Sequence, residues 1–174
     1  RKCARRFNNI YHVDFFPEPQ NFYFSDKAVK IPGLDGSGKM GKSDGNCIYL
    51  IDEDKTIQKK VMKAVTDSGP TEPNSKMPES IENIFTLLKI VSTPDTVAHF
   101  TEVYNNCSIR YGDLKKQLAT DICKHTLPIR ERIEEIYNDS DYLRKVAKAG
   151  CEKARESAQA TLKEVRAAVG IKSF

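Results

Sequence analysis

The sequence lacks several features that would assign it to a specialised class of protein. None of its apolar runs approaches the roughly 20 residues that a membrane-spanning helix needs, and no signal-peptide pattern opens the chain. Its five cysteines are odd in number and form no C-x-x-C pair, and only three histidines are present. These absences argue against a membrane span, a disulfide framework and a metal site. They favour reduced cysteines and a cytoplasmic protein.

The chain also begins without a methionine. Its first residues, RKCARRFNNIYH, already show helical spacing, with Ala4, Phe7 and either Ile10 or Tyr11 on one side. We therefore expect a piece of a longer chain. The 174 residues suffice for one domain, or for a small domain with part of another.

Positive charge is concentrated near the C-terminus. The net charge of the chain is +4, and residues 141–174, with eight basic and four acidic side chains, account for all of it. A basic C-terminal helix fits contact with a polyanion such as RNA. A solvated helix face fits the same pattern, so charge alone leaves both interpretations open. Lys115, Lys116 and Arg144 are expected to be exposed basic candidates.

Apolar periodicity predicts that the region beyond Asp52 is essentially all helical. Asp52 and Ser80 are expected to cap two of the helices, and Thr93 followed by Pro94 to begin a third. Pro128 is expected to kink or split the long helical stretch that contains it. A last helix is predicted from about residue 142 to residue 169, with small side chains on a buried side at Gly150, Ala154 and Ala158.

The first 51 residues have a different pattern. A helix is predicted to end near Tyr11, and the aromatic stretch that follows is broken by Pro17 and Pro19 and should be extended. Residues 27–31 are a short strand candidate. Residues 47–51 should be extended or hinge-like.

A glycine-rich stretch, GLDGSGKMGKSDGN, fits two kinds of nucleotide-binding loop. From Gly36 to Ser43 it matches the phosphate loop G-x-x-x-x-G-K-[ST]. That loop requires a strand leading directly into it and a helix beginning at its end. Here the turn sequence Asp44-Gly45-Asn46 follows instead, which disfavours such a helix. We therefore do not expect a P-loop NTPase.

From Lys39 to Ser43 the same stretch reads KMGKS, which resembles the KMSKS loop of class I aminoacyl-tRNA synthetases, with Gly41 in place of a serine. The resemblance extends along nearly the whole chain to the bacterial-type tryptophanyl-tRNA synthetases. It is carried by CARRFN near the start, by the SDGN continuation of the loop, and then in order by KKVMKAVTDSG, YGDLKKQLATDI, LPIRERIEEI and AGCEKARESAQATLKEVRAAVG.

The resemblance implies a mainly α fold, in which a helical bundle, the anticodon-binding domain, is attached to the C-terminal remnant of a Rossmann-like α/β catalytic domain. The implied domains are residues 1–46, the end of the catalytic domain with its lysine loop, and residues 47–174, the helical domain. The N-terminal half of the catalytic domain would be missing. No HIGH-like histidine pair is present, because His12, His99 and His125 are isolated in the sequence.

The implied activity of the full-length protein is that of a tryptophan–tRNA ligase. It would activate tryptophan with ATP and Mg²⁺, with no protein ligand assigned to the metal, and transfer it to tRNA(Trp). Lys39 and Lys42 would be catalytic, and Lys39, Met40, Gly41, Lys42 and Ser43 would bind ATP. The full-length protein would be a cytoplasmic homodimer, whereas this piece alone would be inactive. A tyrosyl-tRNA synthetase fragment and a helical RNA-binding module without catalysis remain the alternatives, and no tRNA-reading side chains are assigned.

Overall fold

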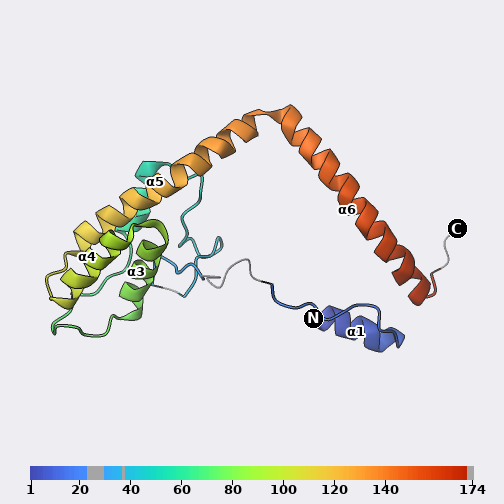
Figure 1. The fold of residues 1–174 in the computed structure, drawn as a ribbon, viewed down its shortest axis with the longest axis horizontal. Helices are drawn as coiled ribbons and strands as arrows, with labels where there is room; N and C mark the ends of the chain where they lie inside the picture. Colours follow the sequence, from blue (N-terminus) through green and yellow to red (C-terminus); the bar gives the residue numbers. More distant parts are fainter. Residues whose placement is uncertain (23–29, 37, 172–174) are drawn as a thin grey trace. The chain divides into compact units, whose positions relative to one another are not determined.

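The computed structural model describes residues 1–22, 30–36 and 38–171, and its helices are labelled in Figure 1. Within these residues the chain forms six α-helices and no β-strand: α1 (Lys2–Tyr11), α2 (Asp54–Met62), α3 (Glu79–Val91), α4 (Pro94–Asn105), α5 (Tyr111–Asn138) and α6 (Ser140–Ala168). The prediction of a mainly helical fold beyond Asp52 is confirmed. The strand expected at residues 27–31 falls mostly outside the described residues, and Lys30 and Ile31 are not in a strand.

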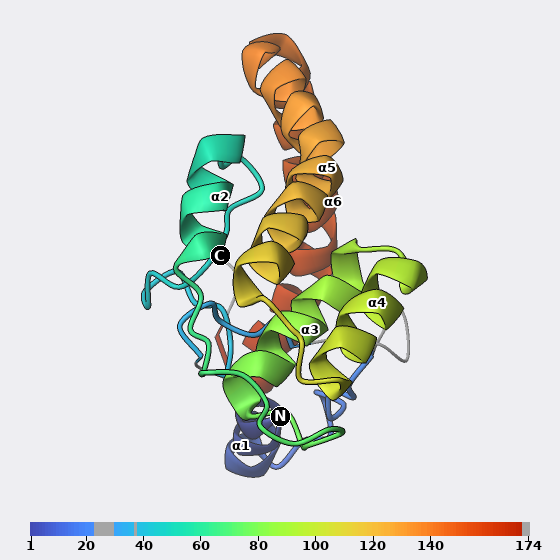
Figure 2. The same ribbon diagram turned by 90° about the vertical axis from the view of Figure 1, so that its left-hand side faces the viewer.

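The chain divides into two compact units, residues 29–135 and residues 1–28 together with 136–174. The first unit contains α2, α3, α4 and most of α5, and α3 and α4 lie beside one another in it (Figure 2). Its core is built from apolar side chains at helical spacing, because each helix turns one apolar face inward. The members buried most deeply are Ile57, Val61, Ile81, Leu88, Tyr104, Leu114 and Leu118.

The expected helix starts are confirmed at one position and wrong at two. Thr93 caps α4, since its hydroxyl accepts a hydrogen bond from the Thr96 N–H at 3.3 Å. Asp52 does not cap α2, because its carboxylate instead accepts from the Tyr49 N–H at 2.9 Å and from Lys60 Nζ at 2.5 Å. The helix therefore begins at Asp54. Ser80 does not cap α3 either, because that helix already begins at Glu79, after Pro78.

Pro128 lies inside α5 and does not split it, since the helix continues to Asn138. A proline removes one backbone N–H but has a φ value that fits a helix. The packed first half of α5, with Leu114, Leu118 and Ile122 buried, provides the stability that offsets the lost hydrogen bond.

The second unit contains α1 and α6. After α1, residues 13–22 are not helical, and the Asn8 side chain accepts hydrogen bonds from the N–H groups of Phe15 and Phe16 at 3.3 and 3.0 Å. Helix α6 has nearly the predicted bounds, and its N-cap Asp139 accepts from the Tyr142 N–H at 2.8 Å. The buried side expected for α6 is wrong, because no residue of this helix is buried.

Candidate functional site

The glycine-rich loop has a buried neck and an exposed tip. Leu34 on the incoming side belongs to the core of the first unit, residues 29–135, which we call the helical unit. Asn46 on the outgoing side is only 7% exposed. The Leu34 N–H donates to the Asn46 carbonyl at 3.3 Å, which closes the neck. The Leu34 carbonyl accepts from the Val65 N–H at 3.0 Å, just after α2. The loop is thus fixed at its neck to the helical unit.

The candidate lysines lie on the exposed tip, where the backbone forms a turn and not a helix. Lys39, Lys42 and Ser43 are exposed, and residues 41–44 form a turn in which the Asp44 N–H donates to the Gly41 carbonyl at 3.2 Å. The next helix begins only at Asp54. A phosphate loop needs a helix N-terminus at this point, so the structure agrees with the rejection of the P-loop interpretation.

Gly41 stands where the KMSKS loop, which this stretch resembles, has a serine. The atoms around Gly41 show what a side chain at this position would contact. A Cβ atom at this position would lie 2.2 Å from Asp44 Oδ2 and 3.0 Å from Asp44 Cγ. Asp44 is exposed, so the end of its side chain could rotate away. The glycine therefore lets the Asp44 carboxylate lie against the turn that carries Lys42.

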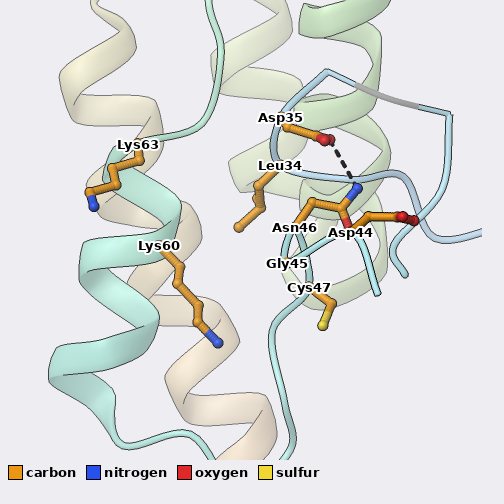
Figure 3. A pocket seen from close by; sticks show the side chains of 8 residues that line it. All are labelled: Leu34, Asp35, Asp44, Gly45, Asn46, Cys47, Lys60 and Lys63. Atoms are coloured by element: carbon orange, nitrogen blue, oxygen red, sulfur yellow. Dashed lines mark hydrogen bonds between the residues drawn. The ribbon is translucent and has the colours of Figure 1, made fainter. Parts of the chain in front are cut away.

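Two cavities flank the loop. The first, of about 280 Å³, is shown in Figure 3 and is lined by Leu34, Asp35, Asp44, Gly45, Asn46, Cys47, Lys60 and Lys63. The second, of about 650 Å³, contains both candidate lysines and is lined by Lys30, Ile31, Lys39, Met40, Lys42, Cys47, Ile48, Tyr49 and Leu50. Ammonium groups beside an apolar wall suit a ligand that combines anionic phosphates with a flat apolar ring.

Two polar residues at the neck, Asn46 and Asp35, were not singled out from the sequence. The Asn46 side-chain oxygen accepts from the Gly41 N–H at 2.9 Å. Its amide nitrogen donates to the Lys39 carbonyl at 3.2 Å and to Asp35 Oδ1 at 3.0 Å. The one sequence signal was the turn-forming sequence Asp44-Gly45-Asn46, which predicts a bend but not the partners of the amide.

Helix α5 holds both ends of α2, the helix whose Lys60 lines the first cavity beside the loop. Arg130 donates to the Asp52 carbonyl at 2.6 Å and to Asp54 Oδ1 at 2.9 Å. Lys115 donates to the Ala64 carbonyl at 2.7 Å, and burial lowers the pKa of its ammonium group. The expectation that Lys115 is an exposed RNA-binding candidate is therefore wrong, because it is half-buried and holds the end of α2.

The other basic candidates lie at the surface. Lys116 and Arg144 are exposed and face acidic residues on their own helices, Asp113 at 3.9 Å and Asp141 at 3.7 Å. The three histidines, His12, His99 and His125, are also exposed and belong to separate elements, the end of α1, α4 and α5. None of them lines either cavity beside the loop.

The comparison with protein families defines the class of protein. Residues 1–125 match the family model of the tRNA synthetases of class I (W and Y). The match covers the lysine loop and α1 to α4, together with the first half of α5. The chain belongs to this family.

Within this family, the chain is similar to tryptophan–tRNA ligases. The chain is 63% identical over 172 residues to the tryptophan–tRNA ligase of Porphyromonas gingivalis, covering 99% of this chain and 53% of that protein. It is 39% identical over 180 residues to that of Streptococcus pyogenes serotype M1, covering 100% and 52%. The chain thus spans about half the length of the curated relatives it matches. The resemblance to tryptophanyl-tRNA synthetases is confirmed.

Solved structures agree with this assignment. The tryptophanyl-tRNA synthetase of Campylobacter jejuni, complexed with ADP and tryptophan, matches with a TM-score of 0.71 and 26% identity, covering 98% of this chain and 52% of that one. The enzyme from Mycoplasma pneumoniae shares the fold, with a TM-score of 0.72 and 24% identity, covering 99% and 52%. Among the described residues, no helix has the length and apolar character to cross a membrane.

Proposed function

We propose that the whole protein to which this chain belongs is a tryptophan–tRNA ligase. It activates tryptophan with ATP, releases pyrophosphate and transfers the aminoacyl group to tRNA(Trp). The observation that carries the proposal is the placement of Lys39 and Lys42 on the exposed tip of the loop, beyond a buried neck, with no helix beginning between this tip and Asp54 in the described residues. This arrangement suits lysines that approach a triphosphate from outside.

In this proposal the two lysines stabilise negative charge on the departing pyrophosphate. A lysine ammonium is a compact charge on a long stem, and it is most effective where charge develops in the transition state. Ser43 donates a hydrogen bond to a phosphate, and the backbone at Met40 and Gly41 lies beside the adenine. Mg²⁺ arrives with ATP, and no residue of this chain is assigned to it.

The proposal also covers domains and partners. Residues 1–46 complete a Rossmann-like catalytic domain and residues 47–174 form an anticodon-binding domain. The proposed partners are tryptophan, ATP and tRNA(Trp), the proposed assembly is a homodimer, and the proposed compartment is the cytoplasm. The comparisons that support this are the tryptophan–tRNA ligases of two bacteria, which match along nearly the whole chain.

The test is amino-acid-dependent exchange between ATP and pyrophosphate, measured on the full-length protein. We expect exchange with tryptophan and none with tyrosine. Lys42→Ala should lower kcat by about a hundredfold or more, since it removes a charge that acts in the transition state. The matched control is Lys116→Ala, which removes an exposed lysine of α5 and should leave exchange unchanged. Exchange with tyrosine, or full activity of Lys42→Ala, would contradict the proposal.

A further inference from the structure

The buried amide of Asn46 spans the backbone between the two candidate lysines. It contacts the Lys39 carbonyl on one side of Met40 and the Gly41 N–H on the other. We propose that Asn46, oriented by Asp35, is a positioning residue that fixes the spacing of Lys39 and Lys42. This inference rests on the proposed role of these lysines as ligands of the ATP phosphates.

The hydrogen-bond pattern selects an asparagine at this position. The Gly41 N–H can only donate, whereas the Lys39 carbonyl and the Asp35 carboxylate can only accept. A side-chain amide offers one oxygen acceptor and one nitrogen with two donor hydrogens. Figure 3 shows the amide of Asn46 directed at Asp35, and this contact settles which way round the amide lies. Asp35 thereby directs the oxygen of Asn46 towards Gly41.

Burial makes these contacts count. Asn46 is 7% exposed, so water cannot readily replace a partner that is lost, and an unpaired buried polar group is costly. The backbone carbonyl of Asn46 also accepts a hydrogen bond from the N–H of Leu34, whose side chain is part of the core. Asn46 and Asp35, joined by their hydrogen bond, form what we call the brace. The brace therefore fixes the path of the lysine loop relative to the helical unit.

The functional consequence follows from the position of the brace. Neither side chain of the brace belongs to the exposed tip, so neither is placed in contact with ATP. Loss of the brace should displace the lysines, and a displacement of about 1 Å can cost on the order of a hundredfold in rate. The effect should appear in the ATP-dependent constants and leave the binding of tryptophan nearly unchanged.

The decisive experiment is a swap of amide and carboxylate in the full-length protein, read out by tryptophan-dependent exchange. Asn46→Asp places a carboxylate against two acceptors and should lower kcat/KM for ATP by between about tenfold and a hundredfold. The KM for tryptophan should change by less than about twofold, because the defect lies in the lysine loop. Asp35→Asn keeps an acceptor oxygen and should remain within about threefold of wild type.

The double variant Asn46→Asp with Asp35→Asn should recover at least about threefold of the lost kcat/KM, because position 35 can then donate to position 46. The double variant has the same net charge as the wild type, so its recovery reports geometry and not charge. Asn138→Asp, at the exposed end of α5, is the matched control and should have no effect.

A second measurement does not depend on activity. Trypsin cleaves after lysine, so cleavage after Lys39 and Lys42 in the native protein reports how firmly the loop is held. Trypsin should cleave the Asn46→Asp variant there at least about threefold faster than the wild type. The cleavage rate of the double variant should return towards the wild-type rate. Asp35→Ala serves as the variant that folds in any case, because Asp35 is exposed, and it should also raise both the cleavage rate and the KM for ATP.

The outcomes separate this inference from the proposed function. If the wild type shows no tryptophan-dependent exchange, the proposed function fails, and cleavage after Lys39 and Lys42 still decides whether the brace exists. The inference is overturned if Asn46→Asp lowers the Tm yet leaves the KM for ATP and the cleavage rates unchanged. It is also overturned if the double variant is no better than Asn46→Asp.

Discussion

Helices α5 and α6 have almost the same length, 28 and 29 residues, but differ in how they are stabilised. Helix α5 buries seven side chains, among them Leu114 and Leu118, whereas α6 buries none. Burying a large apolar side chain contributes about 1.5–3 kcal/mol, far more than helix propensity at one position. The comparison teaches that α5 depends on tertiary packing, while the described part of the chain stabilises α6 through local contacts such as its N-cap.

The largest expected difference between the two helices comes from removing one leucine. Leu118→Ala on α5, where the leucine is 0% exposed, should lower the free energy of unfolding by about 2–5 kcal/mol, because a buried cavity remains. Leu162→Ala on α6, where the leucine is 47% exposed, should change it by less than about 1 kcal/mol. Urea unfolding followed by circular dichroism measures both. Equal losses would show that α6 is packed as tightly as α5.

An arginine pair tests the same contrast for polar contacts. Arg130→Ala removes hydrogen bonds to the Asp52 carbonyl and to Asp54, made by a side chain only 14% exposed, and should cost about 1.5–3 kcal/mol. Arg144→Ala on α6 removes an ion pair to Asp141 whose side chains are 81% and 94% exposed. That loss should stay below about 0.5 kcal/mol. Unfolding in urea gives both values, and a larger loss for Arg144→Ala would reverse the contrast.

The pH dependence of stability should report the half-buried Tyr111 at the start of α5. Burial, and then the hydrogen bond to Asp67 at 2.6 Å, raise the pKa of the Tyr111 phenol above its ordinary value of 10.0. The folded protein therefore keeps this proton when the unfolded chain loses it. The stability contributed by Tyr111 is fully present below the ordinary pKa and is lost as pH rises above it.

We expect Tyr111→Phe to lose stability less steeply than the wild type as pH rises through 10, in thermal unfolding followed at several pH values. Burial lowers the pKa of Lys115 nearby, which makes stability rise with pH in the same range. The comparison is therefore made against the wild type and not read from one curve. Tyr142→Phe, on α6, is the control, because it removes a phenol hydroxyl outside the unit of residues 29–135. Identical slopes for Tyr111→Phe and the wild type would refute the prediction.

How far the sequence predicted the structure depends on whether the deciding contact is local. The start of α4 was correct because Thr93 and Pro94 act within one helical turn. The cap at Asp52 was wrong because its carboxylate accepts from the Tyr49 N–H, outside the helix, and from Lys60, eight residues away. Apolar periodicity predicted the helices beyond Asp52 correctly, since their apolar faces, with Ile81 and Leu88 fully buried, have neighbours to pack against.

The candidate site was also predictable only in part. Lys39 and Lys42 stand in a short contiguous pattern, so the sequence was enough to single them out as candidates. The brace at Asn46 was missed because its partner Asp35 lies 11 residues away, across the neck of the loop. Only the folded path of the backbone brings that amide and carboxylate together. The same limit applies to α6, where periodicity marks a stripe of small residues but not whether anything covers it.

A glycine in that stripe gives the smallest effect and the sharpest test of the comparison. A Cβ atom added at Gly150 of α6 would meet nothing within 4 Å in the described structure. Alanine should therefore be accepted there and should stabilise the helix by about 0.5–1 kcal/mol, because it restricts the unfolded backbone. Ala119→Gly on α5, where the alanine is 2% exposed, should destabilise by at least that amount. If Gly150→Ala were instead destabilising in the full-length protein while raising the helicity of an isolated α6 peptide, a close neighbour would have to cover the stripe, and α6 would depend on packing after all.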